Sequence, residues 1–171
     1  MIQSRIRRLA VLFLVLAATV GCDQTAKHIA RTNLAQGGSI TLPGGFGELR
    51  LMENTGSFLS LGAALSPSLR RAVFTMGVGI GLFALVVWLV FRARLSWLSF
   101  LGFALATAGG ASNLIDRVTR AGRVTDFIFV QVGPLHTGVF NVADSLILLG
   151  LTMVAVAVWH ERPAPAAGLE T

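Results

Sequence analysis

Two uncharged apolar stretches restrict most strongly how this chain can fold. Ala72–Phe91 and Leu95–Ile115 contain no charged residue, and each has the roughly 20 residues that a helix needs to cross the hydrocarbon core of a bilayer. The chain of 171 residues is 54% hydrophobic and 13% charged, whereas soluble domains average about 25% charged residues. The sequence therefore predicts an integral membrane protein, and its net charge of +6 belongs at membrane surfaces rather than on nucleic acid.

A third apolar segment, Leu9–Cys22, is too short to cross a bilayer by itself. A spanning helix must therefore continue to about Ala30 and carry Asp23 and Lys27 within it. Arginines precede this segment and small residues precede Cys22, a pattern that is also typical of a cleavable lipoprotein leader. Cleavage there would remove the first span and place the polar loops on opposite faces of the membrane, so we interpret the helix as retained.

The last apolar segment, Ser145–Trp159, is also short, so its helix should begin near Phe140 and include Asn141 and Asp144 in its first turns. This arrangement gives four spans and places both termini on the same side of the membrane. The predicted fold class is an all-α membrane protein, a four-helix transmembrane bundle with a small extracytoplasmic β-structured region between helices 1 and 2. We expect residues 1–162 to form a single domain and residues 163–171, rich in proline and alanine, to form a disordered tail.

The β-structured region is predicted from residues 37–62, whose glycines and short alternating apolar runs do not suit a span. Within it, ENTGSF places the amide side chain of Asn54 close to Gly56, which permits a tight backbone; taken alone, this motif favours a plain turn over a functional role. Ser66 and Pro67 are then expected as the cap and the first residue of the second spanning helix.

Two observations bear on the orientation of the spans. Six basic residues lie in very short segments on the side of the termini: Arg5, Arg7, Arg8, Arg92, Arg94 and Arg162. The other eight lie in longer loops on the opposite side, but the first helix and short flanking segments usually dominate orientation. Trp88, Trp97 and Trp159 also lie at span ends on the side of the termini, as in an interfacial belt. We therefore predict that both termini are cytoplasmic.

Most of the acidic residues gather on the side opposite the termini. These residues are Asp23, Glu48, Glu53, Asp116, Asp126 and Asp144. Carboxylates near apolar helix ends are costly to bury, so acids inside the membrane are functional candidates by default. The alternative is a set of interfacial charges solvated by lipid headgroups. Six acids on one face, three of them inside apolar helix ends, favour the functional interpretation whichever way the bundle points.

Other polar residues on this side have spacings that place them on shared helix faces. Asp23 and Lys27 are four residues apart, which is the spacing of an ion pair; mutual neutralisation is the simple alternative to a direct role. Asn113, Asp116 and Arg117 share one face of the third span. The sequence therefore predicts a polar constellation at one end of the bundle.

The residue types exclude several kinds of chemistry. The three histidines are scattered and there is one cysteine, so no metal-ligand spacing is present, and a catalytic serine would lack a base. What remains is Asp126, expected in a loop with strand-like alternation, and Asp144, expected at a helix start capped by Asn141. Two close carboxylates can share one proton, so that one activates water and the other polarises an amide carbonyl. Because the helix dipole favours a charged Asp144, we predict Asp144 as the base and Asp126 as the proton carrier.

The motifs DQTAK, ENTGSF, GGASNLIDR, GRVTDF and FNVAD follow one another in the order and spacing of a known family. Over about Leu9–Trp159 the chain resembles lipoprotein signal peptidases (signal peptidase II), four-span aspartic proteases of bacterial inner membranes. The resemblance implies a catalytic dyad of Asp126 and Asp144. It also implies pocket-supporting roles for Asp23, Lys27, Asn54, Gly56, Asn113, Asp116, Arg117 and Asn141. One departure is Ser112, where the family usually has glycine; a serine there would crowd a helix contact or shift Asn113.

That family cleaves the signal peptide of prolipoproteins immediately before a diacylglyceryl-modified cysteine and uses no metal or cofactor. The resemblance therefore implies lipidated prolipoproteins, membrane lipids and globomycin-type inhibitors as partners, and we further expect a monomer. The alternative is a non-catalytic membrane paralogue that binds lipopeptides or globomycin-type inhibitors. The presence of both aspartates and of their neighbouring asparagines favours the enzyme.

Overall fold

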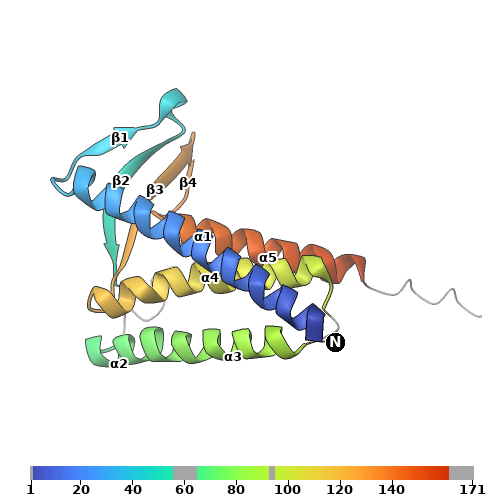
Figure 1. Cartoon of the computed structure of the whole chain (residues 1–171). Coiled ribbons are helices and arrows are strands. Elements are labelled where there is room, and N and C mark those ends of the chain that lie inside the picture. Colours follow the sequence, from blue (N-terminus) through green and yellow to red (C-terminus); the bar gives the residue numbers. More distant parts are fainter. Residues whose placement is uncertain (1, 56–64, 93–94, 162–171) are drawn as a thin grey trace, which may run out of the picture.

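The computed structural model describes residues 2–55, 65–92 and 95–161. Its helices are α1 (Ile2–Leu34), α2 (Pro67–Arg71), the π-helical η3 (Ala72–Gly77), α3 (Val78–Phe91), α4 (Trp97–Thr119) and α5 (Val142–His160). Within the described residues, four helical segments are long and apolar enough to cross a membrane: Arg5–Leu34, Ser68–Phe91, Trp97–Thr119 and Val142–His160. They lie side by side, with the start of α1 and the end of α5 at the same end of the bundle (Figure 1). The predicted four-span bundle is confirmed.

The observed helix boundaries differ by only a few residues from those predicted from the sequence. α1 continues to Leu34, beyond the expected end near Ala30, and α5 begins at Val142, so Asn141 is its cap and lies outside its first turn. The hydroxyl of Ser66 accepts a hydrogen bond from the backbone N of Leu69 at 3.4 Å, as expected of a cap. The wider π-helical turn of η3 was not predicted, because the apolar pattern of a span does not distinguish it from an ordinary helix.

Glycines allow α4 to lie very close to its neighbours. A Cβ atom on Gly102 would lie 2.6 Å from the carbonyl oxygen of Gly150, and one on Gly109 would lie 2.5 Å from the carbonyl oxygen of Ala143. A Cβ atom on Gly110 would lie 2.8 Å from the side chain of Leu82 on α3. Small residues at helix interfaces let the backbones of membrane helices approach closely. The expectation that Gly109 and Gly110 permit close packing is therefore confirmed.

A four-stranded antiparallel sheet covers one end of the bundle (Figure 1). Its strands, in the order in which they pair, are β1 (Ser39–Thr41), β2 (Gly47–Asn54), β3 (Val124–Val132) and β4 (Leu135–His136), with a 3-10 turn, η1 (Pro43–Gly45), between β1 and β2. Only half of this sheet was predicted, since β3 and β4 follow α4. The expectation that Asp126 lies in a loop is wrong: it lies in β3, opposite Met52 of β2. The pairing joins segments about 70 residues apart, which local alternation does not reveal.

The sheet packs on the end of α1. Ala30 and Leu34 form a buried cluster with Phe127 of β3, so the strand that carries Asp126 is held against the first span. Cys22 lies within α1 and is exposed on its surface. The helix therefore runs through the position at which a lipoprotein leader would be cut and continues as one element to the sheet.

Candidate active site

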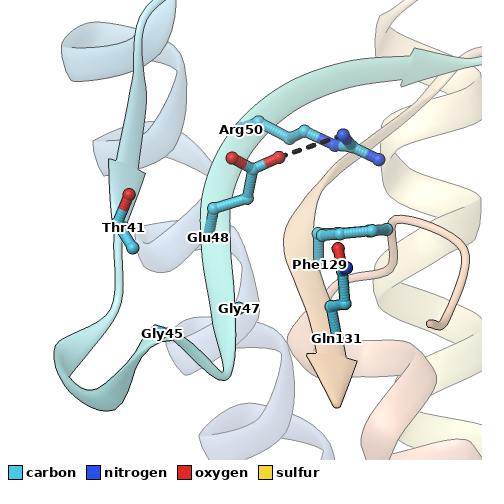
Figure 2. A pocket seen from close by; sticks show the side chains of 7 residues that line it. All are labelled: Thr41, Gly45, Gly47, Glu48, Arg50, Phe129 and Gln131. Atoms are coloured by element: carbon cyan, nitrogen blue, oxygen red, sulfur yellow. Dashed lines mark hydrogen bonds and ion pairs between the residues drawn. The ribbon is translucent and has the colours of Figure 1, made fainter. Parts of the chain in front are cut away.

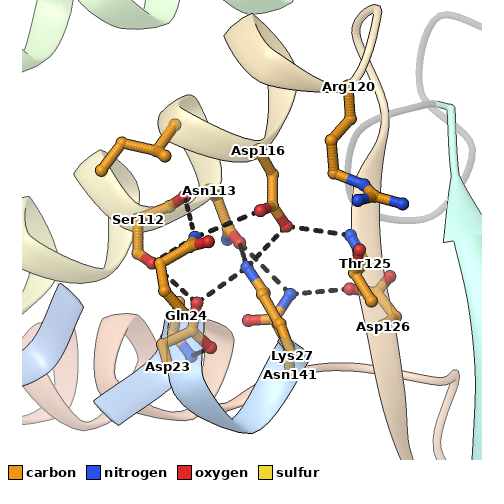
Figure 3. Close-up of polar contacts among 12 residues, drawn as sticks. Asp23, Gln24, Lys27, Ser112, Asn113, Asp116, Arg120, Thr125, Asp126 and Asn141 are labelled. Atoms are coloured by element: carbon orange, nitrogen blue, oxygen red, sulfur yellow. Dashed lines mark hydrogen bonds and ion pairs between the residues drawn. The ribbon is translucent and has the colours of Figure 1, made fainter. Parts of the chain in front are cut away.

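Polar side chains from three helices and the sheet meet where β3 joins the bundle (Figure 3). The fully or almost fully buried members are Asp23 and Lys27 from α1, Ser112, Asn113 and Asp116 from α4, Thr125 and Asp126 from β3, and Asn141 at the start of α5. Burial of so many polar groups is costly unless each has a partner. Their partners define the site.

Lys27 lies at the centre of this network. Its Nζ atom is 2.8 Å from Asp23 Oδ2 and 3.0 Å from Asp116 Oδ2, and it donates a 2.8 Å hydrogen bond to Asn113 Oδ1. The predicted ion pair between Asp23 and Lys27 is confirmed. The second carboxylate, Asp116, comes from another helix, so Lys27 connects α1 to α4 rather than serving only to neutralise a neighbour.

The two carboxylates bound by Lys27 each hold a backbone amide next to a candidate catalytic aspartate. Asp116 Oδ2 accepts a 3.0 Å hydrogen bond from the backbone N of Thr125, the residue before Asp126. Asp23 Oδ1 accepts a 2.9 Å hydrogen bond from the backbone N of Ala143, the residue before Asp144. The ion cluster thus fixes the strand and the helix that carry the two aspartates.

Asp126 is 1% exposed and accepts two amide hydrogen bonds. Asn54 at the end of β2 donates to its Oδ2 at 2.9 Å, and Asn141 donates to its Oδ1 at 2.6 Å. Burial raises the pKa of Asp126 to about 6, and the charge of nearby Asp144 adds to the rise, while the two amide hydrogen bonds oppose it. Asp126 is therefore a carboxyl group that holds its proton unusually well.

Asp144 lies in the first turn of α5 and forms a reciprocal capping box with Asn141. The backbone N of Asp144 donates to Asn141 Oδ1 at 2.9 Å, and the backbone N of Asn141 donates to Asp144 Oδ2 at 3.2 Å. Asn113 donates to Asp144 Oδ1 at 2.8 Å and accepts a 3.2 Å hydrogen bond from Asn141 Nδ2. The two asparagines therefore form an amide bridge between Asp144 and Asp126.

Arg117 lies near this bridge on the predicted face of α4. It is half-buried, and the charges of Asp144, Asp126 and Asp116 all act on it. Its buried Nε atom has no hydrogen-bond partner among the described residues. Of the predicted site residues, Gly56 lies outside the described residues, and the structure brings all the others together.

Three contributors to the network were missed or misjudged from the sequence. Gln24 Nε2 donates to Ser112 Oγ at 3.0 Å and to Asp116 Oδ1 at 3.1 Å, and Thr125 supplies the backbone amide for Asp116. Ser112 was expected to crowd a contact; instead its hydroxyl donates to Asp23 Oδ2 at 2.7 Å. Gln24 follows Asp23 directly in DQTAK, which was the one available signal for it.

A separate cavity of about 240 Å³ lies on the sheet (Figure 2). It is lined by Thr41, Gly45, Gly47, Glu48, Arg50, Phe129 and Gln131. Arg50 is 3.0 Å from Glu48 and lies over the ring of Phe129, so the charged groups in this cavity pair with each other. Neither candidate aspartate lines it. Within the described chain, no group of three histidine, cysteine or acidic residues is placed to hold a metal ion.

Four spans around a pair of aspartates, of which Asp126 is buried and Asp144 half-buried, define a membrane-embedded aspartic peptidase, and the comparisons with known proteins agree. A family model described as signal peptidase (SPase) II matches residues 15–160. The chain is 36% identical over 156 residues to the lipoprotein signal peptidase of Desulforapulum autotrophicum, covering 90% of this chain and 93% of that one. It is 36% identical over 151 residues to that of Xanthomonas oryzae pv. oryzae, covering 86% and 88%. The chain belongs to the signal peptidase II family.

The fold is also that of a solved bacterial membrane enzyme. A structure determined by the in meso method at 1.9 Å resolution superimposes with a TM-score of 0.78 and 27% sequence identity, covering 90% of this chain and 95% of that one. A second, at 2.3 Å resolution, gives a TM-score of 0.76 and 26% identity. The similarity extends over the bundle and the sheet together.

Substitution of Lys27 tests whether the ion cluster holds the site together. Lys27→Met leaves Asp23 and Asp116 buried without their common cation, and breaking a buried pair in this way costs about 3–5 kcal/mol. We expect that loss in the free energy of unfolding of the purified protein in detergent micelles, measured by denaturant titration.

Ser112→Ala is the graded comparison, because it removes one hydrogen bond to Asp23 and leaves the ion pairs intact. Its cost should be smaller, about 1–2 kcal/mol. A loss for Lys27→Met no larger than that for Ser112→Ala would contradict a central role for the cation.

Proposed function

We propose that Asp126 and Asp144 carry out the reaction of this signal peptidase, which cleaves the signal peptides of prolipoproteins. Family membership supports the substrate class, and the cleaved bond in this proposal lies immediately before a diacylglyceryl-modified cysteine. The observation that carries the assignment is the amide bridge from Asp126 through Asn141 and Asn113 to Asp144. The proposed reaction uses no metal or cofactor.

The reaction requires the two carboxyl groups to share one proton. The carboxylate of Asp144 takes a proton from water while the water oxygen bonds to the scissile carbonyl carbon. The proton of Asp126 moves to the carbonyl oxygen, which gives a neutral tetrahedral intermediate. The C–N bond then breaks, the amine leaves with the proton from Asp144, and the hydroxyl proton returns to Asp126. Both groups end in their starting states.

The surroundings of the two aspartates support this division of roles. Asp144 accepts a backbone hydrogen bond in the first turn of α5, where the partial positive charge of the helix dipole favours a carboxylate. Asp126 lies in a strand, and its burial raises its pKa to about 6. Asp126, which must carry a proton in this mechanism, is thus the aspartate whose surroundings favour the protonated form. The charges of Asp144 and Asp126 both act on Arg117, and in this proposal its guanidinium donates to a substrate carbonyl.

Asp126→Asn and Asp144→Asn should each abolish cleavage of a lipidated precursor, since neither variant can share a proton between two carboxyl groups. Glu48→Gln is the matched control, because Glu48 pairs with Arg50 on the sheet and contacts neither aspartate. It should retain activity, and Arg117→Gln should raise KM. The measurement is turnover of the precursor by purified protein, which a globomycin-type inhibitor should block.

Two results of this assay would contradict the proposal. Substantial turnover by either asparagine variant would remove the dyad. Binding of the precursor without cleavage by the wild-type chain would favour the alternative of a non-catalytic paralogue that captures lipopeptides.

Asp126 should also make stability depend on pH. Its pKa in the folded protein is raised from 3.8 to about 6, so the folded state binds the proton more tightly than the unfolded chain does. This stabilisation is fully present below the unfolded value and is lost as pH rises through about 6. The thermal midpoint of the wild type relative to Asp126→Asn should therefore fall across this window, measured by melting in micelles.

A difference in thermal midpoint that stays constant across this pH window would contradict the raised pKa of Asp126. The assignment of Asp144 as base and Asp126 as proton carrier needs a separate measurement. Because the two carboxyl groups titrate together, the probe must report on each residue by itself. Carboxyl carbon chemical shifts should show Asp126 keeping its proton to a higher pH than Asp144. The opposite order would reverse the two roles and leave the dyad in place.

We further propose that both termini face the cytoplasm of a bacterial inner membrane and that the site faces outward. Trp88, Trp97 and Trp159 lie at span ends on the side of the termini, together with the arginines at the start of α1. Reporter fusions should place both termini inside and an insertion in residues 37–47 outside. Termini on opposite sides would contradict four spans. Native mass spectrometry of the purified chain tests the expected monomer.

A further inference from the structure

At the end of the bundle far from the sheet, a group of arginines lies on aromatic rings. The guanidinium carbon of Arg7 is 4.3 Å from the ring centre of Trp97, that of Arg5 is 5.7 Å from Phe91, and that of Arg92 is 6.0 Å from Trp88. A guanidinium within about 6 Å of a ring centre is attracted to the face of the ring, and this attraction holds it near the ring. We refer to Arg5, Arg7 and Arg92 as the arginine patch.

Arg8 lies at the same end of the bundle but uses its guanidinium for hydrogen bonds within the protein. It donates to the carbonyl oxygens of Arg92 at 2.6 Å and Leu95 at 2.8 Å, on either side of residues 93 and 94. These bonds tie the start of α1 to the connection between α3 and α4. The donors of Arg8 are therefore used within the protein, and Arg8 brings Arg92 close to the arginines of α1.

The donors of the arginine patch are not used in this way. Among the described residues, the three guanidinium groups form no hydrogen bond and no ion pair. Glu161 is the one acidic residue that the structure describes at this end, and it is exposed without an ion pair to them. Three cations that lie together without an anion, at the end of a membrane-spanning bundle, favour the binding of an anionic group.

The surface beside the arginine patch identifies the kind of anion. Exposed apolar side chains continue from it along the outside of α1 and α3: Ile6, Leu9, Phe13, Val87, Trp88 and Phe91. Phe13 is 69% exposed and Phe91 is 63% exposed, so both side chains are free to contact acyl chains. A ligand that meets both surfaces has a phosphate and acyl chains. The scarcity of acid at this end disfavours a headgroup that also carries an ammonium.

We propose that the arginine patch binds the headgroup phosphate of an anionic phospholipid, whose acyl chains lie along α1 and α3. Such a lipid would join the start of α1 to the end of α3, which Arg8 already connects through the backbone. The inference depends on the four-span bundle alone. It goes beyond the proposed peptidase activity, so the failure of one would leave the other standing.

The test compares lipid binding by the full chain and two variants. Arg5→Gln/Arg7→Gln/Arg92→Gln removes the patch and keeps Arg8. Arg50→Gln is the matched control, because Arg50 also lies on an aromatic ring, 3.9 Å from the centre of Phe129, but at the opposite end and paired with Glu48. Phosphatidylglycerol and phosphatidylcholine are titrated into the detergent-purified protein, and bound lipid is counted by native mass spectrometry.

Wild type and Arg50→Gln should bind phosphatidylglycerol equally and more tightly than phosphatidylcholine, and the triple variant should lose on the order of tenfold or more in affinity. Equal binding by the triple variant, an equal loss in Arg50→Gln, or no preference over phosphatidylcholine would overturn the proposal. Equally tight binding of soluble glycerol phosphate would overturn the assignment to a lipid. If the triple variant does not fold, Arg7→Gln alone should lose about fivefold, and no loss would count against the patch.

Discussion

A lysine buried between two carboxylates is the interaction on which the rest of this structure depends. Lys27 is 0% exposed and lies within 3.0 Å of Asp23 and Asp116. An ammonium and two carboxylates in an apolar bundle are tolerable only when the remaining oxygens and protons also have partners. Asp23 meets this need by accepting from the backbone amide of Ala143 with its other oxygen, and Asp116 accepts from the backbone amide of Thr125 with the oxygen that also contacts Lys27. The same hydrogen bonds therefore give the buried carboxylates their partners and hold the backbone beside Asp126 and Asp144 in place.

The close approach of the helices is what makes these bonds short enough. α4 and α5 nearly touch at Gly109, where even a methyl group would meet the carbonyl oxygen of Ala143, and the backbone N of the same Ala143 binds Asp23 of α1, so the three helices meet at this point. Ser112 occupies the space that remains and gives Asp23 a further donor. The serine at this position therefore adds to the polar network without displacing Asn113, which still binds both Lys27 and Asp144.

The sequence predicted the spans, and it pointed to the polar residues that the structure brings together, because both depend on local signals. Uncharged stretches such as Ala72–Phe91 require a helix in a bilayer, and a polar residue such as Asp23 within a span requires a partner. It could not predict strand β3, whose partner β2 lies about 70 residues earlier, nor which carboxylate from another helix meets Lys27. The strand pairing and the ion pair both depend on packing between distant segments of the chain, and the periodicity of a single segment carries no information on that packing.

The first helix is held at both of its ends by polar contacts, which favours our interpretation of it as a retained span over a removed leader. Arg8 binds carbonyl oxygens beside the α3–α4 connection, and Lys27 binds carboxylates at the site. Nineteen residues separate them, about 28 Å of helix, which matches the thickness of the hydrocarbon core. Cys22 lies between these two anchors on the exposed surface of α1. A cut there would separate the end of α1 that carries Lys27 and packs on the sheet from the end that Arg8 holds, so the helix that supplies the cation would no longer cross the membrane.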